Sequence, residues 1–388
     1  NFFESTTDII RRVKMKVSIM SMQRIANYGS FLQAYALKKT IETLGHQVDF
    51  ADYRVQTCLI QSQKVEQGRD TYIKDKAFRL MNAIKCFAYK IPFDQHKQFY
   101  QNYSGKYLRI IGVSDERRER PDTDVLVIGS DEVFNCVQSN PDVGCSMELF
   151  GKDSRAKKII SYAASFGNTG IKELRRFDVQ DEIAELLKKF TAISVRDKNS
   201  EAIVKELTGK MPQKHLDPVL IYDYKKEVTS CTYHMPFERY MVVYAYSSRI
   251  TKQEGKEIKR FAKKNGLKLI AIGGEHSFCD VSIYPKPFEV LSIIKNAAYV
   301  VTDTFHGTVF SIKYNKQFGT LIRKGNGEKY GNCEKLNDLL STFNLNDREI
   351  KEISDLDFIL NSKIDYKSVN EIIAVNRKNT LEYLKSNI

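Results

Sequence analysis

Several features that would assign a protein class at once are missing from this chain of 388 residues. No apolar run approaches the roughly 18 residues that suggest a membrane-spanning helix. The seven cysteines form an odd set without a Cys-x-x-Cys pair, which argues against a disulfide framework and against a zinc site. Neither Gly-x-Gly-x-x-Gly nor Gly-x-x-x-x-Gly-Lys occurs. We therefore expect no metal site, no dinucleotide site and no P-loop ATPase.

The positive charge is spread along the chain. The sequence has 61 Lys and Arg against 48 Asp and Glu, a net charge of +13, but the lysines lack the interleaved aromatic residues of a single-strand binder. We therefore expect no nucleic-acid partner and a cytoplasmic location. Five cations share one predicted helical face: Lys252, Lys256, Lys259, Arg260 and Lys263. Such a face suits either peripheral contact with the anionic inner surface of a membrane or attraction of an anionic substrate.

Short apolar runs rich in β-branched residues alternate with helical patterns along most of the chain. This alternation predicts βαβ units and an α/β fold with mainly parallel sheets. Because 388 residues are too many for one ordinary domain, we expect two domains. The predicted strands are 17–20, 48–53, 125–128, 158–162 and 192–195 in the first domain and 241–246, 267–272, 298–302 and 317–322 in the second. The predicted helices of the second domain are 251–264, 287–296 and 307–315.

The composition also suggests where the parts of the chain begin and end. We expect leader residues at 1–14, an N-terminal domain at 15–223, a polar linker at 224–238, a C-terminal domain at 239–365 and a final helix at 366–388. The segment 54–121 is basic and helical without clear strands, which predicts an insertion or a lid. The apolar face of the final helix suggests that it packs back on the N-terminal domain.

Four groups of polar residues directly follow predicted strands. They are Asn27-Tyr-Gly-Ser30, Gly129-Ser-Asp131 with Asn135, Arg196-Asp197, and the residues from Thr302 to Thr308. The carboxyl edge of a parallel sheet is where ligands bind in such folds. Each group alone is also ordinary loop and cap chemistry. Together we expect them to line one cleft between the domains.

Two of these residues have features suited to chemistry. His306 follows a strand and the helix-capping sequence Thr302-Asp-Thr304, so it lies near a helix N-terminus, where free N–H groups and the helix dipole favour a phosphate or carboxylate. Gly307 allows a ligand close to the backbone. Arg196 ends its strand, where a guanidinium can bind an anion in bidentate fashion or instead pair with Asp197. Spacing alone leaves a structural role open for both.

Six segments, in order, resemble motifs of the polysaccharide pyruvyl transferase family. They are 27–37, 127–135, 161–166, 193–197, 216–218 and 301–308, and the resemblance spans about residues 16 to 345. It implies two Rossmann-like domains facing a cleft, similar to GT-B glycosyltransferases. It further implies transfer of pyruvate from phosphoenolpyruvate to a pair of sugar hydroxyls, giving a ketal, in cell-surface polysaccharide biosynthesis. Phosphoenolpyruvate is then a co-substrate, and no cofactor is implied.

The resemblance also implies roles for residues at matching motif positions. His306 is the acid/base or a phosphate ligand, Arg196 clamps the carboxylate or phosphate of the donor, and Asp131 faces the cleft. The other implied donor-site residues are Ser130, Thr304, Phe305, Gly307, Thr308 and Arg323. The implied acceptor-site residues are Asn27, Tyr28, Gly29 and Asn135. The acceptor is expected to be a sugar nucleotide or a lipid-linked saccharide.

One motif departs from the family pattern. Similar proteins carry Arg-Leu-His where this chain has Thr304-Phe305-His306, so a cation two residues before the histidine is missing. Arg323, at the end of the next strand, is the predicted replacement, unless the donor is less anionic or different. Two other functions remain open from the sequence: a GT-B glycosyltransferase that uses a nucleotide sugar, and a non-catalytic protein that binds anionic saccharides.

Overall fold

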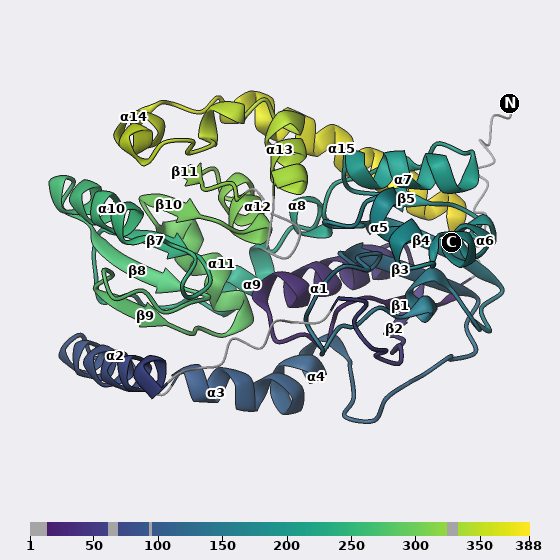
Figure 1. The fold of residues 1–388 in the computed structure, drawn as a ribbon, viewed down its shortest axis with the longest axis horizontal. Helices are drawn as coiled ribbons and strands as arrows, with labels where there is room; N and C mark the ends of the chain where they lie inside the picture. The colour runs from purple at the N-terminus through teal and green to yellow at the C-terminus, as the bar shows by residue number, and fades with distance from the viewer. Residues whose placement is uncertain (1–13, 61–68, 93–94, 324–332) are drawn as a thin grey trace, which may run out of the picture.

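The structure is a computed structural model that describes residues 14–60, 69–92, 95–323 and 333–388 (Figure 1). Of the side chains in 69–78, only those of Lys76 and Ala77 are described. The predicted leader therefore lies almost entirely outside the described residues. Within them, two parallel β-sheets lie side by side, each flanked by helices.

The first sheet has six strands in the order β2-β1-β3-β4-β5-β6, and every pairing is parallel. The strands are β1 (Lys16–Met20), β2 (Gln47–Phe50), β3 (Val125–Asp131), β4 (Lys158–Ala164), β5 (Ser194–Val195) and β6 (Gln213–Lys214). The helices of this domain include α1 (Tyr28–Glu42), α5 (Ile171–Arg176), α6 (Gln180–Lys188) and α7 (Lys198–Thr208). All seven residues of β3 are buried. This is the pattern expected of a central strand covered on both faces.

The second sheet has five strands in the order β11-β10-β7-β8-β9, again all parallel. The strands are β7 (Tyr240–Tyr244), β8 (Lys268–Ile272), β9 (Val281–Ile283), β10 (Tyr299–Thr302) and β11 (Gln317–Thr320). Its helices are α10 (Lys252–Lys264), α11 (Pro287–Asn296), α12 (Phe305–Lys313), α13 (Cys333–Thr342) and α14 (Leu356–Asn361). The predicted fold class, two α/β domains with parallel sheets, is confirmed. Strand β9 was not predicted, because three residues are too few to show the alternation of apolar and polar residues that indicates a strand.

Each sheet has one point at which the strand order reverses. In the first sheet β1 lies between β2 and β3, and in the second β7 lies between β10 and β8. The connections that leave β1 and β3, and those that leave β7 and β10, therefore run to opposite faces of their sheets. In open α/β sheets the carboxyl ends of the strands at such a switch point form the ligand-binding crevice. The fold thus marks one position in each domain.

The helices between residues 69 and 111 belong to the first domain in sequence and contact both domains. They are α2 (Arg69–Ala88), α3 (Gln95–Asn102), a π-helical turn (Tyr103–Tyr107) and α4 (Leu108–Ile111). Helix α2 packs on β9 of the second domain, whereas α4 packs on α1 of the first. In α2 the amide of Asn82 donates to Ser282 O at 3.1 Å and accepts from Ser282 N at 2.9 Å. Strand β9 is the edge strand of the second sheet. The two bonds from Asn82 satisfy the backbone N–H and C=O of Ser282, which would otherwise be open to pairing with another strand.

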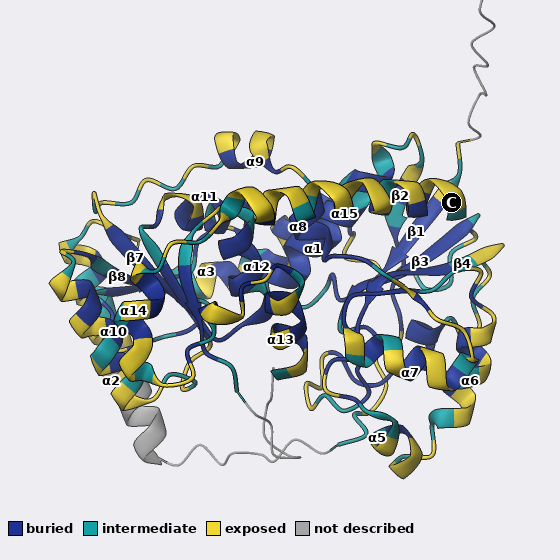
Figure 2. Cartoon of the chain, turned by 90° about the horizontal axis from the view of Figure 1, so that it is seen from above, coloured by how far each residue is buried: buried dark blue, intermediate teal, exposed yellow. Residues whose placement is uncertain are grey.

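Two further helical segments join the domains. The final helix, α15 (Tyr366–Asn387), runs across both of them (Figure 2), and its Tyr383 hydroxyl donates to Ser161 O in β4 at 2.8 Å. Residues 218–230 contain α8 (Pro218–Ile221) and α9 (Lys225–Ser230), so six of the fifteen residues of the predicted linker are helical. Glu227 of α9 is buried and accepts from the Tyr35 hydroxyl of α1 at 2.6 Å.

The two domains share one hydrophobic core. Phe31 and Tyr35 of α1 both contact Phe288 of α11 edge-on, with ring centroids 5.6 and 4.9 Å apart. All three rings are buried, and they belong to one continuous cluster of buried apolar residues that includes parts of both sheets. The domains are therefore packed against each other by aromatic contacts beneath the switch points.

Candidate active site

The two switch points face each other, and Asn27 joins them. Asn27 caps α1, because its Oδ1 accepts from Gly29 N at 2.7 Å and from Ser30 N at 3.3 Å. Its Nδ2 donates to the hydroxyl of Tyr246, which lies just after β7 in the second domain. Cap and bridge together fix the start of α1 against the second domain. Asn27, which the sequence predicts on the acceptor side, therefore lies where the two domains meet.

A buried charge cluster lies beside this cap. Arg196 Nη1 donates to Asp217 Oδ2 at 3.1 Å, and Arg196 Nη2 lies 3.4 Å from Asp131 Oδ1. The second oxygen of Asp131 accepts from Ser30 Oγ at 2.8 Å, and Ser130 Oγ lies 3.4 Å from Asp217 Oδ2. Arg196 thus bonds two carboxylates through its terminal nitrogens.

The sequence had left open a pairing of Arg196 with its neighbour Asp197. No such bond forms. Asp197 caps α7 by accepting from Ser200 N at 2.9 Å, and it also accepts from Ser165 Oγ at 2.6 Å. Asp197 is thereby committed to the start of α7, whereas Arg196, just after β5, is bonded to Asp131 and Asp217.

His306 completes the cluster from the second domain. Its Nε2 lies 3.5 Å from Asp217 Oδ2, and its side chain keeps 11% of its surface exposed, whereas that of Asp217 has none. The ring lies so close to the start of α1 that a Cβ on Gly29 would meet Nδ1 at 2.1 Å. Only glycine fits there. The carboxylate and the backbone of α1 therefore hold the imidazole from two sides.

Asp217 was not among the predicted site residues, although the segment 216–218 was noted as a motif. It caps the short helix α8 by accepting from Val219 N at 3.0 Å, with Pro218 in the first helical position. The Asp-Pro pair is a recognisable helix start. Nothing local showed that the other carboxylate oxygen would meet Arg196 and His306.

Both carboxylates of the cluster are held in their charged form. Burial on its own would raise the pKa of Asp217, but bonding to His306, together with Arg196 and the Val219 N–H, brings that pKa below its ordinary value. The pKa of Asp131 is likewise lowered, because Arg196, His306 and the Ser30 hydroxyl outweigh burial.

Thr304 and its neighbours build the start of α12. Thr304 is the N-cap, with its Oγ1 accepting from Gly307 N at 2.9 Å, and Thr308 Oγ1 donates to Thr304 O at 3.1 Å. A Cβ on Gly307 would meet Thr302 Oγ1 at 2.1 Å, so this turn also requires glycine. The Phe305 ring lies under the Arg196 guanidinium at 4.2 Å. This stacking holds Arg196 to the second domain.

Three predicted site residues are engaged elsewhere. Tyr28, expected on the acceptor side, is buried in the shared core with its hydroxyl donated to Pro285 O at 2.9 Å. Asn135 bonds Glu132 and Thr169 and so supports the loop after β3. Arg323, the predicted substitute cation, forms two bonds to Glu254 in the first turn of α10, at 2.7 and 3.0 Å.

A second buried charge group lies behind the start of α12; it includes Asp303, from the predicted polar group 302–308, and Arg249, which was not predicted. Asp303 is fully buried and Oδ2 lies 3.8 Å from Arg249 Nη1. Burial raises the pKa of Asp303 to about 6, against the opposing effect of Arg249 and Arg323. Arg249 in turn stacks on the Tyr246 ring at 4.5 Å. This group connects the cap of α12 with the tyrosine that bonds Asn27.

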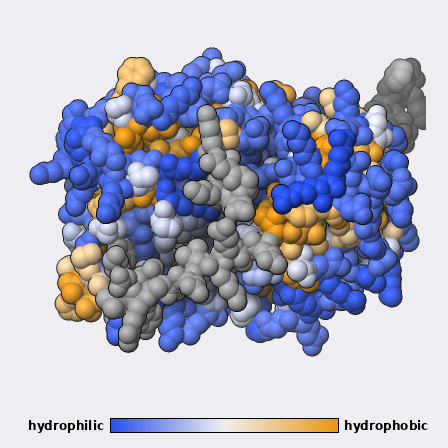
Figure 3. All heavy atoms as spheres, viewed as in Figure 1, coloured by the Kyte–Doolittle hydropathy of each residue, from blue (hydrophilic) through white to orange (hydrophobic). Residues whose placement is uncertain are grey.

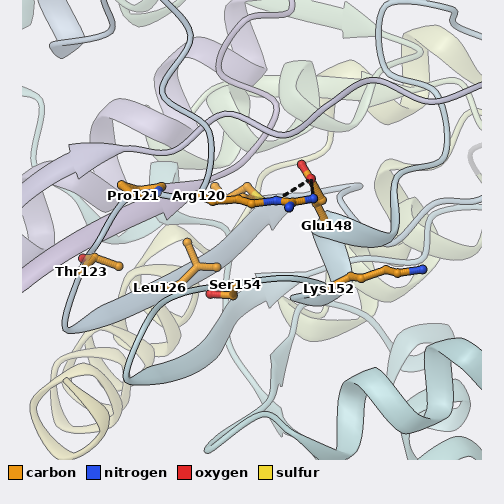
Figure 4. Close-up of a pocket in the computed structure, with 8 residues that line it drawn as sticks. Arg120, Pro121, Thr123, Leu126, Glu148, Lys152 and Ser154 are labelled. Carbon is orange, nitrogen blue, oxygen red and sulfur yellow. Dashed lines mark hydrogen bonds and ion pairs between the residues drawn. The ribbon is translucent and has the colours of Figure 1, made fainter.

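A small cavity of about 10 Å³ lies in the first domain. Figure 4 shows Arg120 and Leu126 among the residues that line it. That volume holds about one water molecule, and Arg120 is already bonded to Glu148 at 2.8 Å. Among the described residues, no three His, Cys, Asp or Glu side chains converge as metal ligands. The junction of the switch points is thus the candidate active site.

The candidate site thus consists of a histidine and buried carboxylates at the place where two parallel α/β domains meet. The family model for polysaccharide pyruvyl transferase matches residues 27–324, and the chain belongs to this family. No curated protein matches the chain in a sequence search.

Several solved structures are similar in overall fold. A glycosyltransferase of kitacinnamycin is 10% identical, with 97% of this chain and 100% of that chain covered and a TM-score of 0.48. The rhamnosyltransferase SpnG of spinosyn is 10% identical, with 96% and 100% covered and a TM-score of 0.45. The glycosyltransferase SsfS6 of Streptomyces sp. SF2575 is also 10% identical, with 96% and 99% covered and a TM-score of 0.43.

Proposed function

We propose that this protein transfers pyruvate from phosphoenolpyruvate to two hydroxyls of a saccharide and releases phosphate. The observation that carries the proposal is the contact of His306 with Asp217 at the meeting of the two switch points. Family membership supports the same reaction class. The acceptor we propose is a sugar nucleotide or a lipid-linked saccharide, and its product a cyclic ketal of a cell-surface polysaccharide.

The reaction needs one group that gives and takes protons. A proton is added to C3 of phosphoenolpyruvate, C2 becomes electrophilic, and a first sugar hydroxyl adds to C2 and loses its proton. A second hydroxyl then displaces phosphate from C2, its proton leaves with the released phosphate, and the ketal closes. In this scheme His306 delivers the first proton and accepts one from a hydroxyl. Asp217 orients the imidazole and stabilises its charged form, as a carboxylate beside a catalytic histidine does.

The donor is a strong anion, so its place in the site is constrained by charge. Asp131 and Asp217 would repel it, whereas the start of α12 would attract it through the helix dipole. Gly307 and Thr308 already direct their N–H groups to Thr304. The N–H groups of Phe305 and His306 come earlier in the helix and have no partner within it. We propose that these two N–H groups bind the phosphate or carboxylate of the donor. Arg196 and Arg323 contribute through their ion pairs, which Arg196 forms with Asp131 and Asp217 and Arg323 forms with Glu254.

The test is a calorimetric titration combined with an assay of phosphate release. The purified protein is titrated with phosphoenolpyruvate and, separately, with nucleotide sugars, and phosphate release is then followed with candidate saccharides present. We expect heat with phosphoenolpyruvate and acceptor-dependent phosphate release. His306→Ala should abolish release, whereas the exposed His234→Ala should not. Heat with a nucleotide sugar and none with phosphoenolpyruvate would favour a glycosyltransferase and overturn the proposal.

A further inference from the structure

Helix α2 carries a row of exposed apolar side chains. Leu80, Ile84 and Phe87 have exposed fractions of 66, 63 and 83%, and Met81 beside them has 42%. The spacing i, i+4 and i+7 places the first three on one helical face. Figure 3 shows this exposed apolar area at the lower left, where Figure 1 places α2. Scattered exposed apolar residues are normal, but a contiguous row with an exposed phenylalanine marks an interaction surface.

The opposite face of α2 is already occupied. Asn82 bonds the backbone of β9 at Ser282, Lys85 Nζ donates to Cys279 O at 2.9 Å, and Cys86 is buried. The helix is therefore anchored to the second domain with its outer row directed away from it. The exposed apolar row is therefore not the face by which α2 packs on its own protein.

The charge of this region is mainly positive. Between residues 69 and 111 the sequence has nine Lys and Arg, against the three acidic residues Asp70, Asp75 and Asp94. Lys76 and Arg79 of α2 and Lys90, just after its end, are exposed. An apolar row beside exposed cations, in a segment with a positive net charge, is complementary to an anionic lipid surface, where cations meet headgroups and apolar side chains enter the acyl boundary.

We propose that the outer face of α2 docks the protein on an anionic membrane. Leu80, Ile84 and Phe87 enter the boundary between headgroups and acyl chains, and Lys76 and Arg79 bind lipid phosphates. The contact is peripheral, since none of the helices in the described part of the chain has the length and apolar content to cross a bilayer. This inference goes beyond the proposed catalysis and does not depend on it.

The face predicted from the sequence, on α10, is less suited to this role. Of its five cations, Arg260 pairs with Glu257 and Asp357. The large apolar residues of α10, Ile258 and Phe261, are buried. The α10 face therefore offers cations but no apolar row.

The experiment uses the absence of tryptophan from this chain. Phe87→Trp places a single fluorescent reporter in the α2 row. Phe358→Trp places a matched reporter on α14, beside α10, at a residue that is 76% exposed. Each full-length variant is mixed with vesicles of phosphatidylglycerol and phosphatidylcholine in equal parts, and with pure phosphatidylcholine. We expect a blue shift only for Phe87→Trp and only with the anionic vesicles.

Charge variants and a dilution series complete the test. In the Phe87→Trp background, Lys76→Glu with Arg79→Glu should weaken vesicle binding by about tenfold or more. Each cation near an anionic surface strengthens binding severalfold, and this double variant removes two of them. No shift with anionic vesicles would overturn the proposal. So would a shift of Phe358→Trp alone, which points to the α10 and α14 face. A blue shift that grows with protein concentration in the absence of lipid would show self-association, and would overturn it too.

Discussion

Nε2 of His306 lies 3.5 Å from Oδ2 of Asp217, although the two residues are 89 positions apart and belong to different parts of the fold. Asp217 stands at the start of α8 and His306 in the first turn of α12, and the two helices pack together. The same Asp217 oxygen accepts from Arg196 Nη1 at 3.1 Å. One buried carboxylate therefore organises both the cation of the first domain and the imidazole of the second.

Asp217→Asn tests this arrangement with almost no change of shape. The amide oxygen can still accept from Val219 N, so the cap of α8 is kept, but the charge that orients and stabilises the His306 imidazole is lost. We expect kcat for acceptor-dependent phosphate release to fall by about 10²-fold or more, with a smaller change in KM for phosphoenolpyruvate. Asp223→Asn, at an exposed position, is the matched control and should leave kcat unchanged. An unaltered kcat in Asp217→Asn would contradict the assigned role.

Gly29→Ala tests the approach of α1 to the imidazole. The added Cβ would meet His306 Nδ1 at 2.1 Å, a distance that requires the ring or the helix to move. Because displacement of a catalytic group by about 1 Å can cost about 10²-fold in rate, we expect a loss of that order in kcat. Gly105→Ala adds the same methyl group where no atom lies within 4 Å and should be silent. Equal activities of the two variants would show that the ring is not held by α1.

Thr304→Ala tests whether the residue in place of the family arginine serves as a helix cap. Its Oγ1 accepts from Gly307 N at 2.9 Å, and loss of an N-cap oxygen costs about 1 kcal/mol of folding free energy. We expect the free energy of unfolding, measured in denaturant, to fall by about that amount. Thr304→Ser keeps the oxygen and should retain most of the stability. A fall of equal size in both variants would mean that the methyl group, and not the cap, matters.

Asp303→Asn should change the pH dependence of stability. Burial raises the folded pKa of Asp303 to about 6, above the unfolded value of about 3.9. The favourable contribution of the protonated form is therefore complete below about pH 4 and is lost as the pH rises through about 6. Asparagine does not titrate, so the stability of the variant relative to the parent should increase from about pH 4 to about pH 7, by on the order of 2 kcal/mol.

The measurement is a series of denaturant unfolding curves across this pH range, with the exposed Asp122→Asn as control. A stability difference between Asp303→Asn and the parent that stays flat with pH would show that Asp303 is charged in the folded protein throughout.

Much of the fold was predictable because its signals are local. The period of apolar residues predicted helix 287–296 at the bounds of α11, and helix 251–264 within one residue of α10. The predicted start of the next helix was residue 307. Helix α12 begins two residues earlier, at Phe305, because its N-cap is Thr304. The strands with strong apolar runs were found, whereas β6 and β9, with two and three residues, were missed.

The sequence by itself determined the alternation of strands and helices, the positions of the polar groups after the strands, and the family. These depend on neighbours within a few residues along the chain. The tertiary structure alone decided that Arg196 pairs with Asp131 and Asp217, that Gly29 lies against His306, that Arg323 is bound by Glu254, and that α2 turns an apolar row outward. Such contacts depend on how two sheets and their helices pack, because side chains far apart in sequence meet only when the domains share a core.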